Sequence, residues 1–287
     1  MKQVTILSGK GGTGKTTITG CFAALADEPV LADCDVDASN LHLILNPKIR
    51  ETMEFKGLKL AEIDPEKCTR CGLCMQLCRF DAIHDYAVDP IHCEGCKVCV
   101  ANCPVDAISF NERVCGHAYL SDTEYGPMSH ARLTPGMENS GKLVTLVRQN
   151  AAKLAEETDR ELVLADGPPG IGCPVIASLS NVDAAVAVVE PTLSGIHDLR
   201  RALQLLEHFE VTPSVIINKY DLNVGNAASI RGFCEEHGIP MLGMIPFDEN
   251  VTRAMVQAKP VVVYSPGSPA SLAIREAWIE FSSFLGL

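Results

Sequence analysis

The sequence has no apolar run that approaches the roughly 20 residues needed to cross a bilayer. Its first residues lead straight into a strand and a loop, without the pattern of a signal peptide. Basic residues are scarce, since 24 Lys and Arg stand against 36 Asp and Glu, and the formal net charge is −12. Such a charge disfavours binding to nucleic acid and to anionic membranes. These absences predict a cytoplasmic protein with neither kind of partner.

Cysteine, by contrast, is abundant. Thirteen cysteines occur in 287 residues, and in a reducing compartment they are not expected to form structural disulfides. The length suits one large α/β domain, or a domain of about 200 residues with a small insert. Because disulfides are not expected, the spacing of the cysteines has to indicate what they bind.

A glycine-rich loop follows the first apolar run, Val4 to Leu7. Its residues 9–16 read G-K-G-G-T-G-K-T and match the phosphate-binding pattern G-x-x-x-x-G-K-T, in which backbone N–H groups surround phosphate oxygens. An amphipathic helix is expected directly after it, from about Lys15 to Leu25. Lys15 is predicted to contact the β and γ phosphates, and the Thr16 hydroxyl to bind Mg²⁺. The predicted nucleotide-binding residues of this segment are Gly9, Gly11, Gly12, Thr13, Gly14, Lys15, Thr16 and Thr17.

Acidic residues end two apolar strands. Asp33 ends the predicted strand from Val30, with Asp35 two residues later, and Asp166 follows the strand Leu162 to Ala165. Parallel strands deliver such residues to the edge that holds a phosphate loop, where Mg²⁺ or a water molecule is bound. Asp166 is predicted to be the second magnesium anchor. A solvated acidic loop is the alternative for Asp33 and Asp35.

Two later loops are candidates for contact with the base. Asn218-Lys219-Tyr220-Asp221 follows the strand Ser214 to Ile217, and Pro246-Phe247 follows the strand Met241 to Ile245. The pattern Asn-Lys-x-Asp is also typical of GTPases that recognise guanine through the aspartate. Asn218, Lys219, Asp221, Pro246 and Phe247 are therefore predicted to bind the nucleotide, and ATP and GTP both remain open at this point.

A cysteine pattern occurs twice, with an offset of 25 residues. The pattern C-x-x-C-x-x-C-x-x-x-C begins at Cys68 and again at Cys93, and the triplet Asp-Ala-Ile follows each copy. Such spacing predicts two [4Fe-4S] clusters, each held by three cysteines of one run and the fourth of the other. The predicted ligands are Cys68, Cys71, Cys74 and Cys103 for the first cluster, and Cys93, Cys96, Cys99 and Cys78 for the second. Two zinc sites or unliganded thiols are the alternatives, and zinc sites favour separated pairs.

The resulting prediction is an α/β P-loop NTPase with a mostly parallel sheet flanked by helices. A small α+β domain, similar to a bacterial two-cluster ferredoxin over about 66–111, is expected as an insert. Arg79 stands where such ferredoxins usually have proline. The expected bounds are 1–60 and 113–287 for the ATPase domain and 61–112 for the insert, and residues 115–142 are expected to form turns and short strands.

With these segments placed, the chain resembles the MinD/ParA/Mrp class of P-loop ATPases, and within it the subgroup that has an inserted ferredoxin domain. Besides the phosphate loop and the cysteines, the resemblance rests on residues 126–131, 138–144, 166–174, 190–199 and 218–221. It implies that Lys10 is the signature lysine of a deviant Walker A loop and reaches the nucleotide of a partner subunit. A homodimer, or a heterodimer with a paralogue, would then enclose two nucleotides. Asp35 is expected to orient the attacking water, with Asp33 and Asp166 supporting Mg²⁺, so that Lys10, Lys15 and Asp35 form the catalytic set.

The resemblance implies adenine as the base and leaves several uses of hydrolysis open. The favoured hypothesis is an ATPase that assembles or delivers a metal–sulfur centre to a metalloprotein client. The alternatives are an ATP-gated electron donor for a redox partner, resembling the nitrogenase iron protein, and a MinD-like positioning ATPase. The late C-x-x-C of Mrp-type carriers is missing here. Cys115 and Cys173 are a candidate third cluster site, with a buried structural thiol as the alternative. Cys21, Cys34 and Cys234 are assigned to packing.

Overall fold

The structure is a computed structural model that describes residues 1–135 and 140–287, apart from the side chains of Leu58 and Ser140. The chain divides into two compact units. Unit 1 comprises Met1–Thr52, Ala118–Arg132 and Ser140–Leu287, and unit 2 comprises Met53–His117 and Leu133–Asn139. Two long strands, β3 and β6, contain residues of both units.

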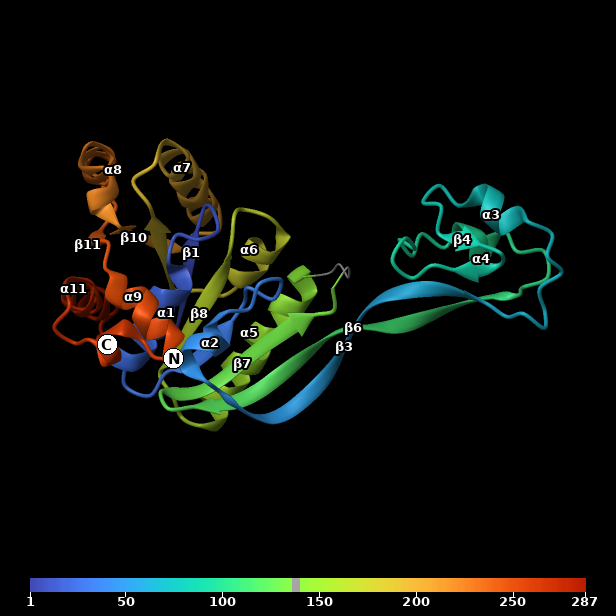
Figure 1. The fold of residues 1–287 in the computed structure, drawn as a ribbon, viewed down its shortest axis with the longest axis horizontal. Helices are drawn as coiled ribbons and strands as arrows, with labels where there is room; N and C mark the ends of the chain where they lie inside the picture. Colours follow the sequence, from blue (N-terminus) through green and yellow to red (C-terminus); the bar gives the residue numbers. More distant parts are fainter. Residues whose placement is uncertain (136–139) are drawn as a thin grey trace. The chain divides into compact units, whose positions relative to one another are not determined.

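The described chain contains a nine-stranded sheet with the order β11-β10-β9-β1-β8-β2-β7-β6-β3 (Figure 1). Its strands are β1 (Lys2–Ser8), β2 (Val30–Asp33), β3 (Lys48–Ile63), β6 (Ile108–Thr123), β7 (Gly126–Leu133), β8 (Leu162–Pro169), β9 (Ala184–Val189), β10 (Thr212–Asn218) and β11 (Met241–Ile245). Neighbouring strands from β11 to β7 pair in parallel. Only two residues join β6 to β7, a length that suits an antiparallel hairpin. The parallel strands all direct their carboxyl ends to one edge, where the phosphate loop lies.

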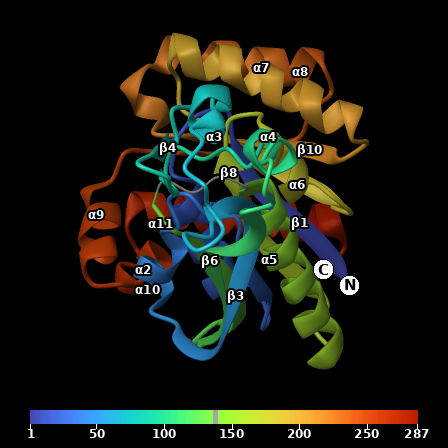
Figure 2. The same cartoon turned by 90° about the vertical axis from the view of Figure 1, so that its right-hand side faces the viewer.

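The central strands are apolar throughout because both faces of the sheet are covered. In β9, for example, Val186 and Val188 belong to one buried cluster, while Ala185, Ala187 and Val189 belong to the other. Side chains of the helices α1 (Lys15–Leu25), α2 (Leu41–Leu45), α10 (Val261–Tyr264) and α11 (Pro269–Leu285) build the first cluster. Side chains of α6 (Cys173–Ser178), α7 (Leu193–His208) and α8 (Val224–Glu236) build the second. Figures 1 and 2 both show α7 and α8 side by side.

The helices of unit 1 connect and cover these strands. They are α1 (Lys15–Leu25), α2 (Leu41–Leu45), α5 (Ser140–Glu157), α6 (Cys173–Ser178), α7 (Leu193–His208), α8 (Val224–Glu236), α9 (Glu249–Val256), α10 (Val261–Tyr264) and α11 (Pro269–Leu285), with the 3-10 turn η1 (Tyr220–Leu222). The terminal helix α11 packs into the core, since the Phe22 ring lies 5.0 Å from that of Trp278 and 6.0 Å from that of Phe281. Within the described residues, no helix is both long enough and apolar enough to span a membrane.

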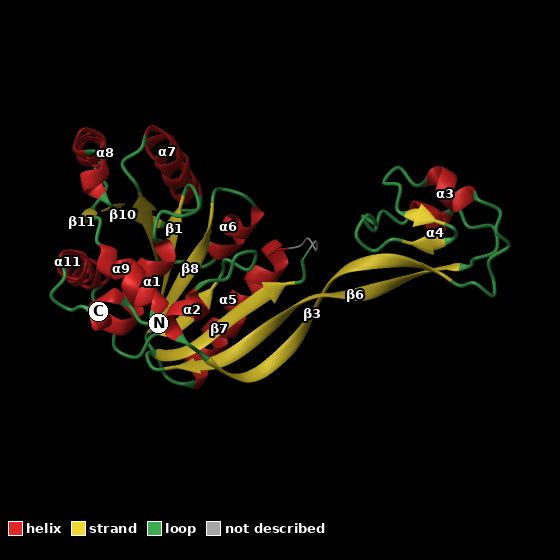
Figure 3. Cartoon of the chain, viewed as in Figure 1, coloured by secondary structure: helices red, strands yellow, loops and turns green. Residues whose placement is uncertain are grey.

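The backbone conformation of unit 2 recurs with an offset of 25 residues, which is also the offset of its cysteine pattern. Besides parts of β3 and β6 it contains the antiparallel pair β4 (Ile83–His84) and β5 (Ala87–Val88) and the short helices α3 (Leu73–Leu77) and α4 (Val98–Ala101) (Figure 3). The starts of α3 and α4 are 25 residues apart. Left-handed φ angles recur at the same offset, in the pairs Arg70 and Gly95, Gly72 and Lys97, and Asp81 and Asp106. The two halves of the unit therefore share one local fold.

The expectation of turns and short strands over 115–142 was wrong. Residues 108–123 form the 16-residue strand β6 and residues 126–133 form β7, while residues 136–139 lie outside the described part. Gly116, Gly126 and Pro127 suggested breaks, yet Gly116 lies within β6 and the other two begin β7. A Cβ at Gly126 would lie 2.0 Å from the Pro29 carbonyl oxygen, so this glycine permits a close approach of two chain segments. Pairing within the sheet outweighs the weak strand preference of these residues.

Candidate functional site

The phosphate loop joins β1 to α1 at the carboxyl edge of the sheet. Gly12 and Gly14 have φ angles of 81° and 95°, which a side chain would strain. The space at Gly9 is restricted as well, because a Cβ there would lie 2.3 Å from the Asp198 Cβ. The phosphate-binding pattern explains Gly9 by the phosphates, whereas in the structure the neighbour that excludes a side chain is Asp198 of α7.

A cavity of about 550 Å³ opens beside this loop. Its walls come from the segments that connect β1 to α1, β2 to α2, β10 to η1 and β11 to α9. Eleven predicted site residues line it, namely Gly11, Gly12, Gly14, Lys15, Thr16, Thr17, Asp35, Asn218, Lys219, Pro246 and Phe247. Apolar residues of α2 and α9 complete the wall, and no sequence motif points to them: Leu43, Ile44, Val251 and Met255.

The Thr16 hydroxyl connects the cavity to a buried carboxylate. Thr16 Oγ1 donates a hydrogen bond of 2.6 Å to Asp166 Oδ2, and Thr19 Oγ1 donates one of 3.2 Å to Asp166 Oδ1. Burial raises the pKa of Asp166 to about 6, and the positive charge of Lys15 opposes this shift. A carboxylate behind a cavity-lining hydroxyl is an oxygen ligand set that suits Mg²⁺.

Asp33 lies next to Asp166, since the two residues pair in the registers of β2 and β8. Burial and the neighbouring Asp166 raise the pKa of Asp33 to about 8. Its carboxylate accepts hydrogen bonds from the Ser39 hydroxyl at 2.6 Å and from the Leu41 N–H at 3.2 Å. These contacts hold the segment that leads into α2, and a cation beside two buried carboxyl groups would favour their ionised forms.

Asp35 lies in the same segment and lines the cavity. Burial raises its pKa, and the charge of Lys15 lowers it. Lys15 is only 5% exposed. The segment therefore presents a carboxylate close to the lysine that is predicted to hold the phosphates.

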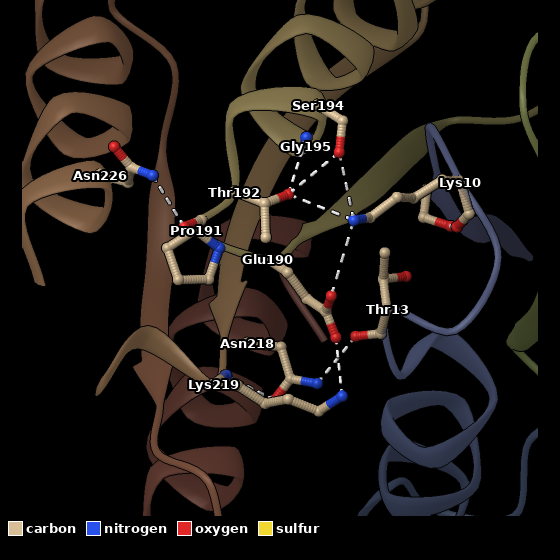
Figure 4. Close-up of polar contacts among 11 residues, drawn as sticks. Lys10, Thr13, Glu190, Pro191, Thr192, Ser194, Gly195, Asn218, Lys219 and Asn226 are labelled. Carbon is tan, nitrogen blue, oxygen red and sulfur yellow. Dashed lines mark hydrogen bonds and ion pairs between the residues drawn. The ribbon is translucent and has the colours of Figure 1, made fainter. Parts of the chain in front are cut away.

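Lys10 is held by the loop between β9 and α7 of its own chain. Its Nζ lies 3.2 Å from Thr192 Oγ1, 3.4 Å from Ser194 Oγ and 3.8 Å from Glu190 Oε2 (Figure 4). Lys219 Nζ donates a hydrogen bond of 2.7 Å to the other oxygen of Glu190. Glu190 thus binds two lysines. Reasoning on single motifs missed this role, although Glu190 ends an apolar strand just as Asp166 does.

The residues after β10 contact other loops. Asn218 Nδ2 donates a hydrogen bond of 2.8 Å to the Thr13 carbonyl (Figure 4), and the Phe247 N–H donates one of 2.8 Å to Asp221 Oδ1. Within the described chain Asp221 is not among the residues that line the cavity. The structure therefore places Asp221 against the Pro246-Phe247 loop.

The eight repeated cysteines of unit 2 line two small cavities of about 20 Å³ each. One cavity contains Cys68, Cys71, Cys74 and Cys103, and the other contains Cys78, Cys93, Cys96 and Cys99. Equivalent backbone bonds reach the fourth cysteine of each run, since the Ala82 N–H lies 3.4 Å from Cys78 Sγ and the Ala107 N–H 3.3 Å from Cys103 Sγ. All thirteen cysteines lie in the described part of the chain and are free thiols.

No group of three or more His, Cys, Asp or Glu side chains among the described residues is arranged to hold a metal ion. Burial raises the pKa of Cys74 and of Cys99, so their ionised form depends on a positive partner.

The remaining cysteines divide by burial. Cys21, Cys34 and Cys234 are buried in unit 1, and burial raises the pKa of Cys21 and of Cys234 to about 11. Cys115 is buried and its thiol donates to the Arg113 carbonyl at 3.4 Å, whereas Cys173 is exposed. Cys115 belongs to unit 2 and Cys173 to unit 1.

Comparisons with known proteins agree with this nucleotide site. The family model of the CobQ/CobB/MinD/ParA nucleotide binding domain matches residues 4–261. An uncharacterized protein of Methanocaldococcus jannaschii is 34% identical over 286 residues, which cover 99% of this chain and 97% of that protein. A putative septum site-determining protein MinD of Nephroselmis olivacea is 23% identical over 293 residues, covering 96% and 85% of the two chains.

Solved structures share the fold. The septum site-determining protein MinD complexed with Mg-ADP from Pyrococcus horikoshii matches with a TM-score of 0.63 at 18% identity, covering 99% of this chain and 97% of that one. The MinC:MinD cell division protein complex of Aquifex aeolicus matches with a TM-score of 0.60 at 20% identity, covering 99% and 96%.

Proposed function

The chain belongs to the CobQ/CobB/MinD/ParA family of nucleotide-binding proteins, and on this premise we propose that it uses ATP to assemble or deliver a metal–sulfur centre to a client protein. It is a P-loop ATPase that binds ATP and hydrolyses it to ADP and phosphate. The proposal concerns the purpose of that hydrolysis. The observation that carries it is the pair of four-cysteine cavities in unit 2.

Several features of unit 2 support two resident [4Fe-4S] clusters. Each cavity combines three cysteines of one run with the fourth of the other, as the spacing predicts. The N–H groups of Ala82 and Ala107 point to sulfur atoms, and such contacts stabilise thiolates bound to iron. The repeated left-handed positions shape both cysteine loops alike. We assign this ferredoxin-like insert to about residues 61–112, within the larger unit 2.

In the nucleotide site we assign the phosphates to the backbone of residues 9–17 and to Lys15. Mg²⁺, when bound, neutralises phosphate charge, and Thr16, Asp33 and Asp166 would hold it. Asp35, on the wall of the same cavity, would orient the attacking water. Asn218 and Lys219 support the base side, together with Pro246 and Phe247.

Dimerisation across the nucleotide is the proposed role of Lys10. In the single chain this lysine rests on Thr192, Ser194 and Glu190. Transfer of its charge to the phosphates of a partner subunit would link hydrolysis to association, because charge develops there during phosphoryl transfer. The dimer can be homomeric or formed with a paralogue.

A positioning ATPase is the second candidate function. The MinD names of several relatives favour it. The eight cysteines have no use in that function, and the polar face of α11 carries Arg275, Glu276 and Glu280 instead of a basic face for lipid binding. We therefore rank it below the metal–sulfur role.

The test uses anaerobically reconstituted full-length protein labelled with ⁵⁷Fe, and an apo-ferredoxin as the acceptor. ATP-dependent appearance of ⁵⁷Fe clusters in the acceptor supports delivery. Oxidation of the resident clusters coupled to hydrolysis, with no iron moved, would instead establish an electron donor. ATP-dependent binding to anionic vesicles without either event would establish a positioning ATPase. Cys234→Ala, which removes a buried thiol of unit 1 outside the two sets, is the control for cysteine variants of unit 2.

A further inference from the structure

The tetrapeptide Asn218-Lys219-Tyr220-Asp221 joins three loops of the nucleotide site. Three of its side chains have protein partners: Asn218 donates to the Thr13 carbonyl, Lys219 donates to Glu190, and Asp221 accepts from the Phe247 N–H. A segment that recognised guanine directly would have to present the Asp221 carboxylate to the base. Here Oδ1 is engaged, and Asp221 is absent from the described lining of the cavity.

The partner of Asp221 lies where the base is expected. Asn218 and Ile245 pair in the register of β10 and β11, so the loops that follow these strands are neighbours. Pro246 and Phe247 line the cavity opposite the phosphate loop, and the Phe247 side chain is 53% exposed. The hydrogen bond of 2.8 Å from the Phe247 N–H to Asp221 ties this loop to η1.

That bond changes which polar groups the loop offers to a base. Pro246 has no N–H, and the N–H of Phe247 is taken by Asp221. At these two positions the backbone therefore has carbonyl acceptors and no free donor. The exocyclic amino group of adenine is a donor and matches a carbonyl acceptor, whereas the O6 of guanine is an acceptor and does not.

We propose that Asp221 is a positioning residue for base selection, which favours adenine over guanine by occupying the Phe247 N–H. The other end of the loop is fixed separately, since Asp248 accepts from the N–H groups of Asn250 at 2.9 Å and Ala270 at 3.2 Å. Removal of the Asp221 carboxylate therefore frees one donor and leaves the loop anchored. The inference rests on the nucleotide cavity alone and does not depend on the iron–sulfur clusters.

Calorimetric titration of the full-length protein with ADP and with GDP, both with Mg²⁺, tests the proposal. For the unmodified chain we expect ADP to bind more tightly. Asp221→Ala should reduce the ratio of the GDP and ADP dissociation constants about 10-fold, because a donor becomes free for O6 of guanine. Asp221→Asn keeps an oxygen acceptor at Oδ1 and should keep the ratio within about 3-fold of the unmodified value. Asp27→Ala removes an exposed aspartate between α1 and β2 and should leave it unchanged.

Amide hydrogen exchange at Phe247 reports whether its N–H is still hydrogen-bonded to Asp221. It should be slow in the unmodified chain and in Asp221→Asn, and faster in Asp221→Ala. Two results would overturn the proposal. One is an unchanged GDP-to-ADP ratio in Asp221→Ala although the Phe247 amide exchanges faster. The other is tighter binding of GDP than ADP by the unmodified chain that is lost in Asp221→Ala, since this would mean that the carboxylate binds guanine directly.

Discussion

Lys10 Nζ lies 3.8 Å from Glu190 Oε2, although the two residues are 180 positions apart in the chain. Glu190 also accepts the Lys219 hydrogen bond of 2.7 Å, so one carboxylate stabilises both lysines. If Lys10 acts on the nucleotide of a partner subunit, this contact has to break when the dimer forms. The partly exposed ion pair then opposes association by a small amount.

We predict that Glu190→Gln strengthens ATP-dependent dimerisation about 2- to 3-fold, because it weakens the contact that retains Lys10. Sedimentation velocity with Mg-ATP measures the dimer dissociation constant. Glu156→Gln, an exposed glutamate of α5, is the control and should have no effect. Weaker dimerisation of Glu190→Gln would show that Glu190 supports the dimer instead of retaining Lys10.

Removal of the Thr16 hydroxyl should impair magnesium-dependent ATP hydrolysis. Thr16→Ala loses the donor to Asp166 and a predicted magnesium ligand, so Mg-dependent ATP hydrolysis should fall about 100-fold. The rate of phosphate release with ATP and Mg²⁺ measures this. Thr145→Ala removes a hydroxyl that donates to the Gly141 carbonyl on α5, and should retain the rate. Equal rates in Thr16→Ala and the unmodified chain would disprove the assignment.

His130 should make the stability of unit 1 sensitive to acid. Burial lowers its pKa to about 4, with further contributions from His42 and Arg132, and its Nε2 lies 2.9 Å from Ser121 Oγ. Between about pH 6.5 and 4 the unfolded chain binds a proton that the folded chain does not, so the free energy of unfolding falls as the pH falls. From pH 7 to pH 5 this loss is about 2 kcal/mol.

His130→Gln should remove that part of the pH dependence. Urea unfolding at pH 7 and pH 5 measures it, because the two chains share their other titrating groups. The difference in free energy of unfolding between the two pH values should be smaller for the variant by about 2 kcal/mol. Equal differences in both chains would mean that His130 titrates normally.

The aromatic contact of α1 with α11 should dominate packing on that face of the sheet. Phe22 is fully buried against Trp278 and Phe281, so Phe22→Ala should lower the free energy of unfolding by about 3–5 kcal/mol. Phe284→Ala changes a residue that is 41% exposed at the end of α11 and should cost less than about 1 kcal/mol. Urea unfolding of both variants provides the comparison. Similar losses would place the core of this face elsewhere.

Local signals predicted α1 and several of the parallel strands well. The phosphate loop and α1 follow from glycines and periodicity within 17 residues, and β2 and α1 have the expected bounds. The strands β3 and β6 were not anticipated, because their charged residues and Gly116 hide any alternation and their pairing is a property of the whole sheet.

The sequence predicted those site residues that belong to a recognisable motif, but not the contacts between motifs. Eleven predicted residues share one cavity, since parallel strands bring their carboxyl ends together. The Lys10–Glu190 and Asp221–Phe247 contacts join segments that are far apart in sequence, and no spacing rule reveals them. The contact of Asp221 also shows that the partners of a familiar tetrapeptide depend on the loop beside it.

Iron content in cysteine variants tests the central claim most directly. After anaerobic reconstitution the unmodified chain should contain about eight iron and eight sulfide atoms, and Cys74→Ser or Cys103→Ser about four of each. Because these two cysteines share one cavity, their double variant should still contain about four, whereas a Cys74→Ser/Cys78→Ser double variant should contain almost none. Iron well below eight in the unmodified chain, or the opposite result for the two double variants, would contradict the account.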